Sequence, residues 1–379
     1  MRGRRVRLGA LLALVACLPA AIPVAAAAAP GKLIRSKPYE AQLLPGVPLS
    51  GSAFKVFYKS RTATGQPTRV SGSVLIPDDP APGRPLVGYA IGSQGLADRC
   101  APSAQLAAGS EYEAALVQMV LDKGWTVALT DYPGLGTRGE HPYVVGRALG
   151  PAVLDSMRAA RALGAAHLSA DGPAALMGYS EGGGAAGWAA QLQPRYAPDI
   201  PLVGAAVGGV VADLPAIGAS LDGSPYAFLL AYTFSGFDSA YPKLHLGRYL
   251  NERGRDLVEQ ERTTCIEDAI PTFPFGHASD VTTTNVFEVP AVMRKMRANS
   301  LGRRAPEAPV LLQHARLDQI LPYEQAVGLR KDWCRLGADV HFRDAPGADH
   351  LSSGAGAAKP AIDYLAARFA GEPPPPDSC

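Results

Sequence analysis

Apolar residues along this chain form short continuous runs that alternate with segments in which they recur at helical spacing. The runs are rich in Val, Ile, Leu, Ala and aromatic residues, and they predict strands at 52–60, 69–77, 86–91, 125–130, 174–177, 201–207, 309–313 and 340–343. The helical spacing predicts helices at 111–123, 149–163, 322–336 and 360–369. Strands that alternate with helices in this way indicate an α/β fold, with a mostly parallel sheet flanked by helices.

The alternation stops from residue 211 to residue 302. This segment contains the apolar stretch PYAFLLAYTF at 225–234, a polar helix-like stretch and several prolines. We expect a mainly helical cap (lid) here, inserted between the sixth and seventh predicted strands, with residues 29–210 and 303–379 forming the core. A separate domain is the alternative, but no flexible linker flanks the segment.

Residues 1–28 have the pattern of a secretory signal peptide: a basic start, an apolar run and then small residues. Two other export signals stay open, a lipoprotein box at Cys17 and a degenerate twin-arginine signal at Arg4 and Arg5. The apolar run is too short for a transmembrane anchor. Removing the segment leaves 32 Lys and Arg against 34 Asp and Glu. A nearly neutral mature protein lacks the basic face of a nucleic-acid-binding protein.

Candidate chemistry centres on Gly178-Tyr179-Ser180-Glu181-Gly182, which lies between a predicted strand and a helix-like segment. A serine on a strained strand-to-helix turn needs glycine two positions before and after it, so that strand and helix pass closely. Ser180 would be a nucleophile there, and the backbone N–H of Glu181 would face a developing oxyanion. The pentapeptide alone also arises by chance in a glycine-rich chain, so the context must support it.

A serine nucleophile requires a general base and a carboxylate that orients it. His350 follows the last predicted strand, where a loop would bring it over the sheet edge. The chain order Ser, acid, His then favours Asp318 as the acid, with Asp213 as the alternative. His314 is interpreted as a structural neighbour. The remaining histidines lie inside a strand or before the final sheet segments: His141, His167, His245, His277 and His341.

A second oxyanion donor is expected in the loop that follows the strand at 86–91. Gly92 and Gly95 bracket this loop, which would place the backbone N–H of Gln94 near Ser180. An ordinary glycine turn is the alternative interpretation. No His, Cys or Asp cluster has metal-ligand spacing, so no metal or cofactor is expected.

Nearly the whole mature chain resembles the secretory lipases of the Candida antarctica lipase A type. The resemblance rests on LADRCAPS at 96–103, GYSEGG at 178–183 with YAP and VGAAVGG after it, HARLDQILPY at 314–323, DWCRLGADVHF at 332–342 and GADHLSS at 347–353. It implies an α/β-hydrolase core with a large helical cap. It also implies Ser180, Asp318 and His350 as nucleophile, acid and base, and backbone donors at Gln94 and Glu181.

Four cysteines remain after the signal peptide, which allows two disulfides in three pairings for an exported chain. The resemblance implies one of these pairings, Cys100 with Cys265 and Cys334 with Cys379. The chain departs from the family at two positions. Glu181 stands where other members have Gly, and Gln94 carries an amide where a member has a carboxylate, so only backbone roles carry over there.

The predicted function is that of a secreted triacylglycerol lipase acting through an acyl-enzyme, on lipid or ester substrates at a lipid–water interface. A short-chain carboxylesterase, an acyltransferase and a serine peptidase are alternatives on the same fold. The apolar stretch at 225–234 suits an acyl groove better than a peptidase site. A non-catalytic binding protein is disfavoured by the serine, acid and histidine in the required order.

Overall fold

The computed structural model of the protein describes Gly3 and residues 29–379. The predicted signal peptide and Cys17 therefore lie outside the described residues, apart from Gly3. Among the residues that are described, no helix combines the length and the apolar character needed to cross a membrane.

A nine-stranded sheet organises the molecule, in the order β1-β4-β5-β7-β6-β8-β9-β10-β11. The pairs β1/β4, β4/β5 and β5/β7 are antiparallel, and the remaining pairs are parallel. The strands span β1 (Leu33–Tyr39), β4 (Ser52–Arg61), β5 (Pro67–Ile76), β6 (Leu86–Ala90), β7 (Thr126–Thr130), β8 (Ala174–Tyr179), β9 (Leu202–Gly208), β10 (Val310–His314) and β11 (Val340–Asp344). A separate ribbon pairs β2 (Gln42–Leu44) with β3 (Val47–Pro48). The mixed, mostly parallel sheet confirms the predicted fold class.

Strand β1 was not predicted. It pairs with β4 at the edge of the sheet and most of its residues are exposed, so its sequence LIRSKPY has no buried apolar face. With β1 included, the long helical segment follows the seventh strand of this sheet in chain order, rather than the sixth.

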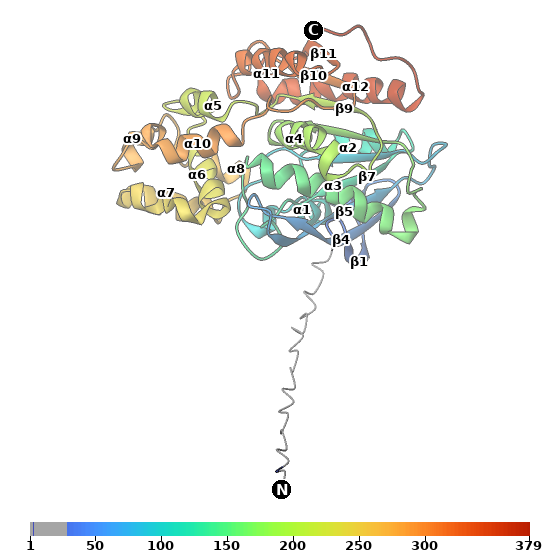
Figure 1. The fold of residues 1–379 in the computed structure, drawn as a ribbon, viewed down its shortest axis with the longest axis horizontal. Coiled ribbons are helices and arrows are strands. Elements are labelled where there is room, and N and C mark those ends of the chain that lie inside the picture. Colours follow the sequence, from blue (N-terminus) through green and yellow to red (C-terminus); the bar gives the residue numbers. More distant parts are fainter. Residues whose placement is uncertain (1–2, 4–28) are drawn as a thin grey trace.

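Helices cover both faces of the sheet (Figure 1). The core helices are α1 (Pro102–Ala108), α2 (Ala114–Leu121), α3 (Gly146–Ala162), α4 (Glu181–Tyr196), α11 (Tyr323–Arg335) and α12 (His350–Phe369). On β6, Gly88 faces α3 so closely that an added Cβ would lie 2.6 Å from the Met157 sulfur. The next residue, Tyr89, points to the opposite face, where its hydroxyl donates to Glu113 just before α2. Because α12 packs against α2, it covers that second face too.

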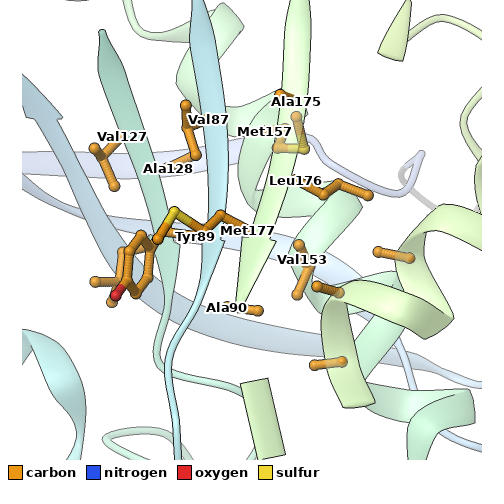
Figure 2. Close-up of a cluster of buried hydrophobic side chains, with 14 of the residues drawn as sticks. Val87, Tyr89, Ala90, Val127, Ala128, Val153, Met157, Ala175, Leu176 and Met177 are labelled. Atoms are coloured by element: carbon orange, nitrogen blue, oxygen red, sulfur yellow. The ribbon is translucent and has the colours of Figure 1, made fainter. Parts of the chain in front are cut away.

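The core lies on both faces of the central strands, against α3 and α4 on one face and α2 and α12 on the other. Figure 2 shows side chains of β6, β7 and β8 gathered with Val153 and Met157, which are one turn apart on α3. Strands β6 and β7 are buried along their whole length because both faces of the sheet are covered.

A second hydrophobic cluster belongs to the helical segment between β9 and β10, which projects from one side of the sheet in Figure 1. Its helices are α5 (Leu214–Leu221), α6 (Phe228–Ala240), α7 (Glu252–Glu261), α8 (Ile266–Ala269), α9 (Ala278–Val281) and α10 (Pro290–Ala298). The cluster also contains Ile320 and Leu321 of the loop after β10. The segment therefore packs onto loops at the carboxyl edge of the parallel strands.

Two disulfides join Cys100 to Cys265 and Cys334 to Cys379, the pairing that the resemblance implies. The first bridge ties the loop after β6 to the start of α8. The same loop forms a backbone bridge there, since Gly95 pairs with Cys265 and Leu96 N–H donates to Thr264 O. Gly95 has φ of +124°, and a Cβ on it would lie 2.6 Å from the Cys265 Cα, so this contact requires glycine.

Candidate active site

Ser180 occupies the sharp turn between β8 and α4. Its φ of 59° and ψ of −124° are strained for a residue with a Cβ. The flanking glycines permit the turn: a Cβ on Gly182 would lie 2.0 Å from Ala90 O, and one on Gly178 would lie 2.3 Å from Gly182 O. These contacts are the close passage of strand and helix that the sequence motif predicts.

The imidazole of His350 connects the predicted nucleophile with the predicted acid. Its Nε2 lies 2.9 Å from Ser180 Oγ, and its Nδ1 lies 2.7 Å from Asp318 Oδ2. The His350 side chain is 5% exposed and the Asp318 side chain is fully buried. Three residues from the ends of three different strands are thus aligned for proton transfer away from the serine hydroxyl.

Asp318 is held as a carboxylate by donors around it. Burial alone would raise its pKa, but the hydrogen bond and charge of His350 and the backbone N–H of Leu321 lower the pKa below its usual value. The N–H groups of Ile320 and Leu321 donate to Oδ1 at 3.0 and 2.8 Å. His314 lies beside the carboxylate and donates from Nε2 to Leu321 O at 2.8 Å, while burial lowers its own pKa.

His350 is the first residue of α12, not a residue of a loop as the sequence analysis expected. Asp349 accepts a hydrogen bond from Ser352 N–H and Ser352 Oγ accepts one from Asp349 N–H, which forms a capping box. Gln319 accepts a bond from His350 N–H, and the Tyr179 hydroxyl donates to His350 O. The sequence analysis overlooked the spacing of Asp349 and Ser352, which is the signal for this helix start.

Two buried carboxyl groups anchor the loop that carries Gln94. Glu113 accepts a hydrogen bond from Gly92 N–H at 2.7 Å, and Glu111 accepts one from the Gln94 amide at 3.2 Å. Gln94 O accepts from Ile266 N–H, so the helical segment holds the other side of the loop. Neither Gln94 N–H nor Glu181 N–H donates to another described residue.

The alternative acid is not brought to this site. Asp213 is exposed and accepts from Ala216 N–H as the N-cap of α5. His167, His245 and His277 are exposed, and His341 lies near Pro376.

Sequence reasoning gave no role to the side chains of Glu181 and His141, which the structure pairs beside Ser180. Glu181 Oε1 lies 3.0 Å from His141 Nε2, and both side chains are 1% exposed. Glu181 and His141 are forty positions apart, so no local pattern predicts their pairing. The signal that the sequence did contain was an acidic residue directly after the serine.

One group of possible metal ligands occurs among the described residues, made of Cys334, Asp377 and Cys379. Its two sulfur atoms are joined in a disulfide and therefore are not thiolate ligands.

Comparison with known proteins adds the family. The sequence profile of the secretory lipase family matches residues 101–376. A secreted triacylglycerol lipase of Malassezia furfur is 30% identical over 330 residues, which cover 82% of this chain and 85% of that protein. A probable inactive lipase of Mycobacterium tuberculosis is 30% identical over 360 residues, which cover 91% of this chain and 80% of that protein.

Solved structures show the same architecture. Candida antarctica lipase A in its closed state matches with a TM-score of 0.83 at 24% identity, over 92% of this chain and 84% of that one. The rice cell wall degrading esterase LipA from Xanthomonas oryzae, in a ligand-bound form, matches with a TM-score of 0.72 at 20% identity, over 88% and 95% of the two chains. The resemblance noted in the sequence is thereby confirmed. The chain belongs to the secretory lipase family, a class of lipases and ester hydrolases, and has the α/β-hydrolase fold.

Proposed function

We propose that this protein is a secreted triacylglycerol lipase that hydrolyses carboxylic esters through an acyl-enzyme on Ser180. The observation that carries the proposal is the single His350 imidazole that bonds both Ser180 Oγ and the buried Asp318 carboxylate. This observation matters because one relative bears a name that marks it as inactive. A nucleophile, base and acid in hydrogen-bonding contact support an active enzyme here.

In the proposed mechanism, His350 Nε2 takes the Ser180 proton as Oγ attacks the ester carbonyl carbon. The carbonyl π electrons move to oxygen, and the N–H groups of Gln94 and Glu181 stabilise that oxyanion. The C–O bond to the alcohol then breaks, and His350 protonates the departing oxygen. Water attacks the acyl-enzyme by the same steps and releases the fatty acid. Asp318 holds the imidazole in position and stabilises its protonated form.

Features of the helical segment 211–302 support its assignment as a cap that receives an acyl chain. An apolar cavity of about 90 Å³ lies among its helices, lined by side chains that include Leu230, Phe234 and Phe287. Two exposed leucines also adjoin proposed catalytic residues in the chain. Leu317, next to Asp318, and Leu351, next to His350, are each 72% exposed. Such exposed apolar side chains suit contact with a lipid–water interface.

The test is substitution of the three proposed catalytic residues, with Asp213 as the control. Ser180→Ala and His350→Ala should each lower kcat by at least about 10⁴-fold, because the three groups act as a unit. Asp318→Asn should lower it by about 10⁴-fold through the wrong imidazole tautomer. Asp213→Asn should leave kcat unchanged, and the reverse result for the two aspartates would refute the acid assignment.

Substrate class is decided by a second measurement. Hydrolysis of p-nitrophenyl esters from short to long acyl chains, followed by an emulsified triglyceride, separates a lipase from a short-chain carboxylesterase. Activity confined to soluble short esters would refute the lipase assignment. A fluorophosphonate probe should label Ser180, and the absence of labelling would refute a serine hydrolase altogether.

A further inference from the structure

A carboxyl group is buried directly after the proposed nucleophile. The Glu181 side chain is 1% exposed and meets the equally buried His141 at 3.0 Å. A carboxyl group withdrawn from water costs several kcal/mol unless it is paired and hydrogen-bonded. A small side chain would follow Ser180 without that cost, so the local contacts of Glu181 have to offset it.

His141 is oriented through both of its ring nitrogens. Nδ1 lies 3.3 Å from Pro133 O, a carbonyl oxygen that can only accept, so Nδ1 donates. Nε2 then shares one further proton with the Glu181 carboxyl group. The imidazole also stacks on Tyr132, with ring centroids 5.6 Å apart. The ring therefore offers Glu181 a partner in one fixed place.

Val144 adds a second donor to the same oxygen. Its N–H lies 3.3 Å from Glu181 Oε1, and its φ of 52° is an outlier for a β-branched residue. Such strain persists only where surrounding contacts enforce it, and it occurs preferentially at functional sites. Glu181 is one of the contacts that hold Val144 in this conformation.

Tyr143, one of the two residues between these partners, reaches the other side of the site. The Tyr143 hydroxyl lies 2.8 Å from Ser93 Oγ, and Ser93 directly precedes Gln94. Tyr143 is itself pressed against α6, since a Cβ on Gly236 would lie 2.5 Å from the Tyr143 backbone. Residues 141–144, the bracing segment, thus contact both chain segments whose N–H groups are proposed to bind the oxyanion.

We infer that the bracing segment sets the separation of the two oxyanion donors. His141 and Tyr143 in this segment, and the Glu181 carboxyl group that binds it, act as positioning residues. The inference rests on the proposed function, because it needs the N–H groups of Gln94 and Glu181 to act in the transition state. Donors must lie about 2.7–3.1 Å from the oxyanion, so a small displacement of either one weakens catalysis without changing ground-state binding.

The first experiment compares Glu181→Ala with Glu181→Gln on p-nitrophenyl butyrate. Glu181→Ala removes the hydrogen-bonding partner of both Val144 and His141, and kcat should fall about 10- to 100-fold, less than the loss of a donor outright. KM should change by less than about twofold, because the effect is confined to the transition state. Glu181→Gln keeps an acceptor oxygen and should recover most of the lost kcat.

The matched control lies at the other end of the same helix. Tyr196→Phe removes a hydrogen bond of 2.6 Å to the buried carboxylate of Asp155, far along α4 from Ser180. It should lower thermal stability and leave kcat unchanged. The fraction of folded enzyme in each preparation is taken from the endpoint of fluorophosphonate labelling. A parental kcat in Glu181→Ala, or a loss that only follows the folded fraction, would overturn the inference.

A second pair of variants decides the matter even where Glu181→Ala does not fold. Tyr143→Phe and Ser93→Ala each remove one side of the same hydrogen bond, and each should lower kcat about 5- to 20-fold. The double variant should be no slower than the slower single variant, because the two residues share one contact. A parental kcat in Tyr143→Phe, or fully additive losses, would refute the bracing segment. Full activity in Ser180→Ala would instead refute the proposed function.

Discussion

Glu111 and Glu113 lie buried beneath the loop that carries Gln94. Burial, together with the nearby charge of Glu113, raises the pKa of Glu111 to about 8, and burial raises the pKa of Glu113 to about 7. One oxygen of Glu111 and the amide oxygen of Gln94 are both buried without a hydrogen-bond partner among the described residues. Protonation of Glu111 adds a hydrogen-bond donor to a carboxyl group that lies beside the Gln94 amide.

The raised pKa values predict how stability changes with pH. Between about pH 4.5 and pH 8 the folded protein holds protons on these groups that the unfolded chain has released, so their contribution to the free energy of unfolding falls as pH rises. Glu111→Gln keeps the acceptor for the Gln94 amide and removes one titration. Urea unfolding at pH 5 and pH 8 should therefore show a smaller pH dependence in Glu111→Gln than in the parent. An identical pH dependence in the two proteins would contradict the raised pKa.

The proposed catalytic residues were predictable because chain order restricts them. Ser180 stands in a recognisable turn, and Asp318 and His350 follow the last two strands, whose carboxyl ends meet at one edge. Chain order does not predict the pairing of Glu181 with His141. It depends on how the chain between β7 and α3 is folded back over α4, and no local pattern encodes that path.

At the scale of elements, α12 carries His350 on its first turn. The Asp349 cap satisfies backbone N–H groups there, and these hydrogen bonds lower the pKa of Asp349 below its usual value. Asp349→Ala should lower the thermal midpoint, because it removes the side chain that caps the helix. It should also lower kcat, because the first turn that orients His350 would fray.

Asp349→Ser is the control for this prediction, since serine caps helices nearly as well. It should restore both the thermal midpoint and kcat. A loss of activity in Asp349→Ser equal to that in Asp349→Ala would mean that the carboxylate, rather than the cap, affects His350.

The central strands, which bury both faces, were predicted, whereas the exposed edge strand β1 was missed. Strands β6, β7 and β10 are buried throughout, and each contains a short run of apolar residues. Strand β1 is exposed on the sheet edge, so neither alternation nor an apolar run marks it. The first turns of α12 contain Ser and Gly in place of strong helix formers, and their helical state depends on the cap and on packing.

At the scale of the whole molecule, the Cys100–Cys265 bridge joins the Gln94 loop to the helical segment across 165 positions of the chain. Cys100→Ser/Cys265→Ser should lower the free energy of unfolding by roughly 2–5 kcal/mol. Activity on a soluble short-chain ester and on an emulsified triglyceride should both fall, because the loop loses its tie.

Cys334→Ser/Cys379→Ser provides the comparison. That bridge links α11 to the far end of the chain and touches no proposed catalytic residue. Its removal should cost stability and leave the kcat of the folded enzyme unchanged. Equal activity in both double variants and the parent would refute the link between the first bridge and catalysis.

The Cys100–Cys265 bridge also affects when, after synthesis, the enzyme becomes fully active. The sheet, the serine turn and the histidine need no sulfur–sulfur bond, whereas the Gln94 loop is fastened by one. Such bonds form in oxidising spaces outside the cytoplasm. A chain still inside the cell that made it would hold its oxyanion loop by hydrogen bonds alone. The ester-hydrolysing activity of such a chain should therefore be lower than that of the exported, oxidised protein.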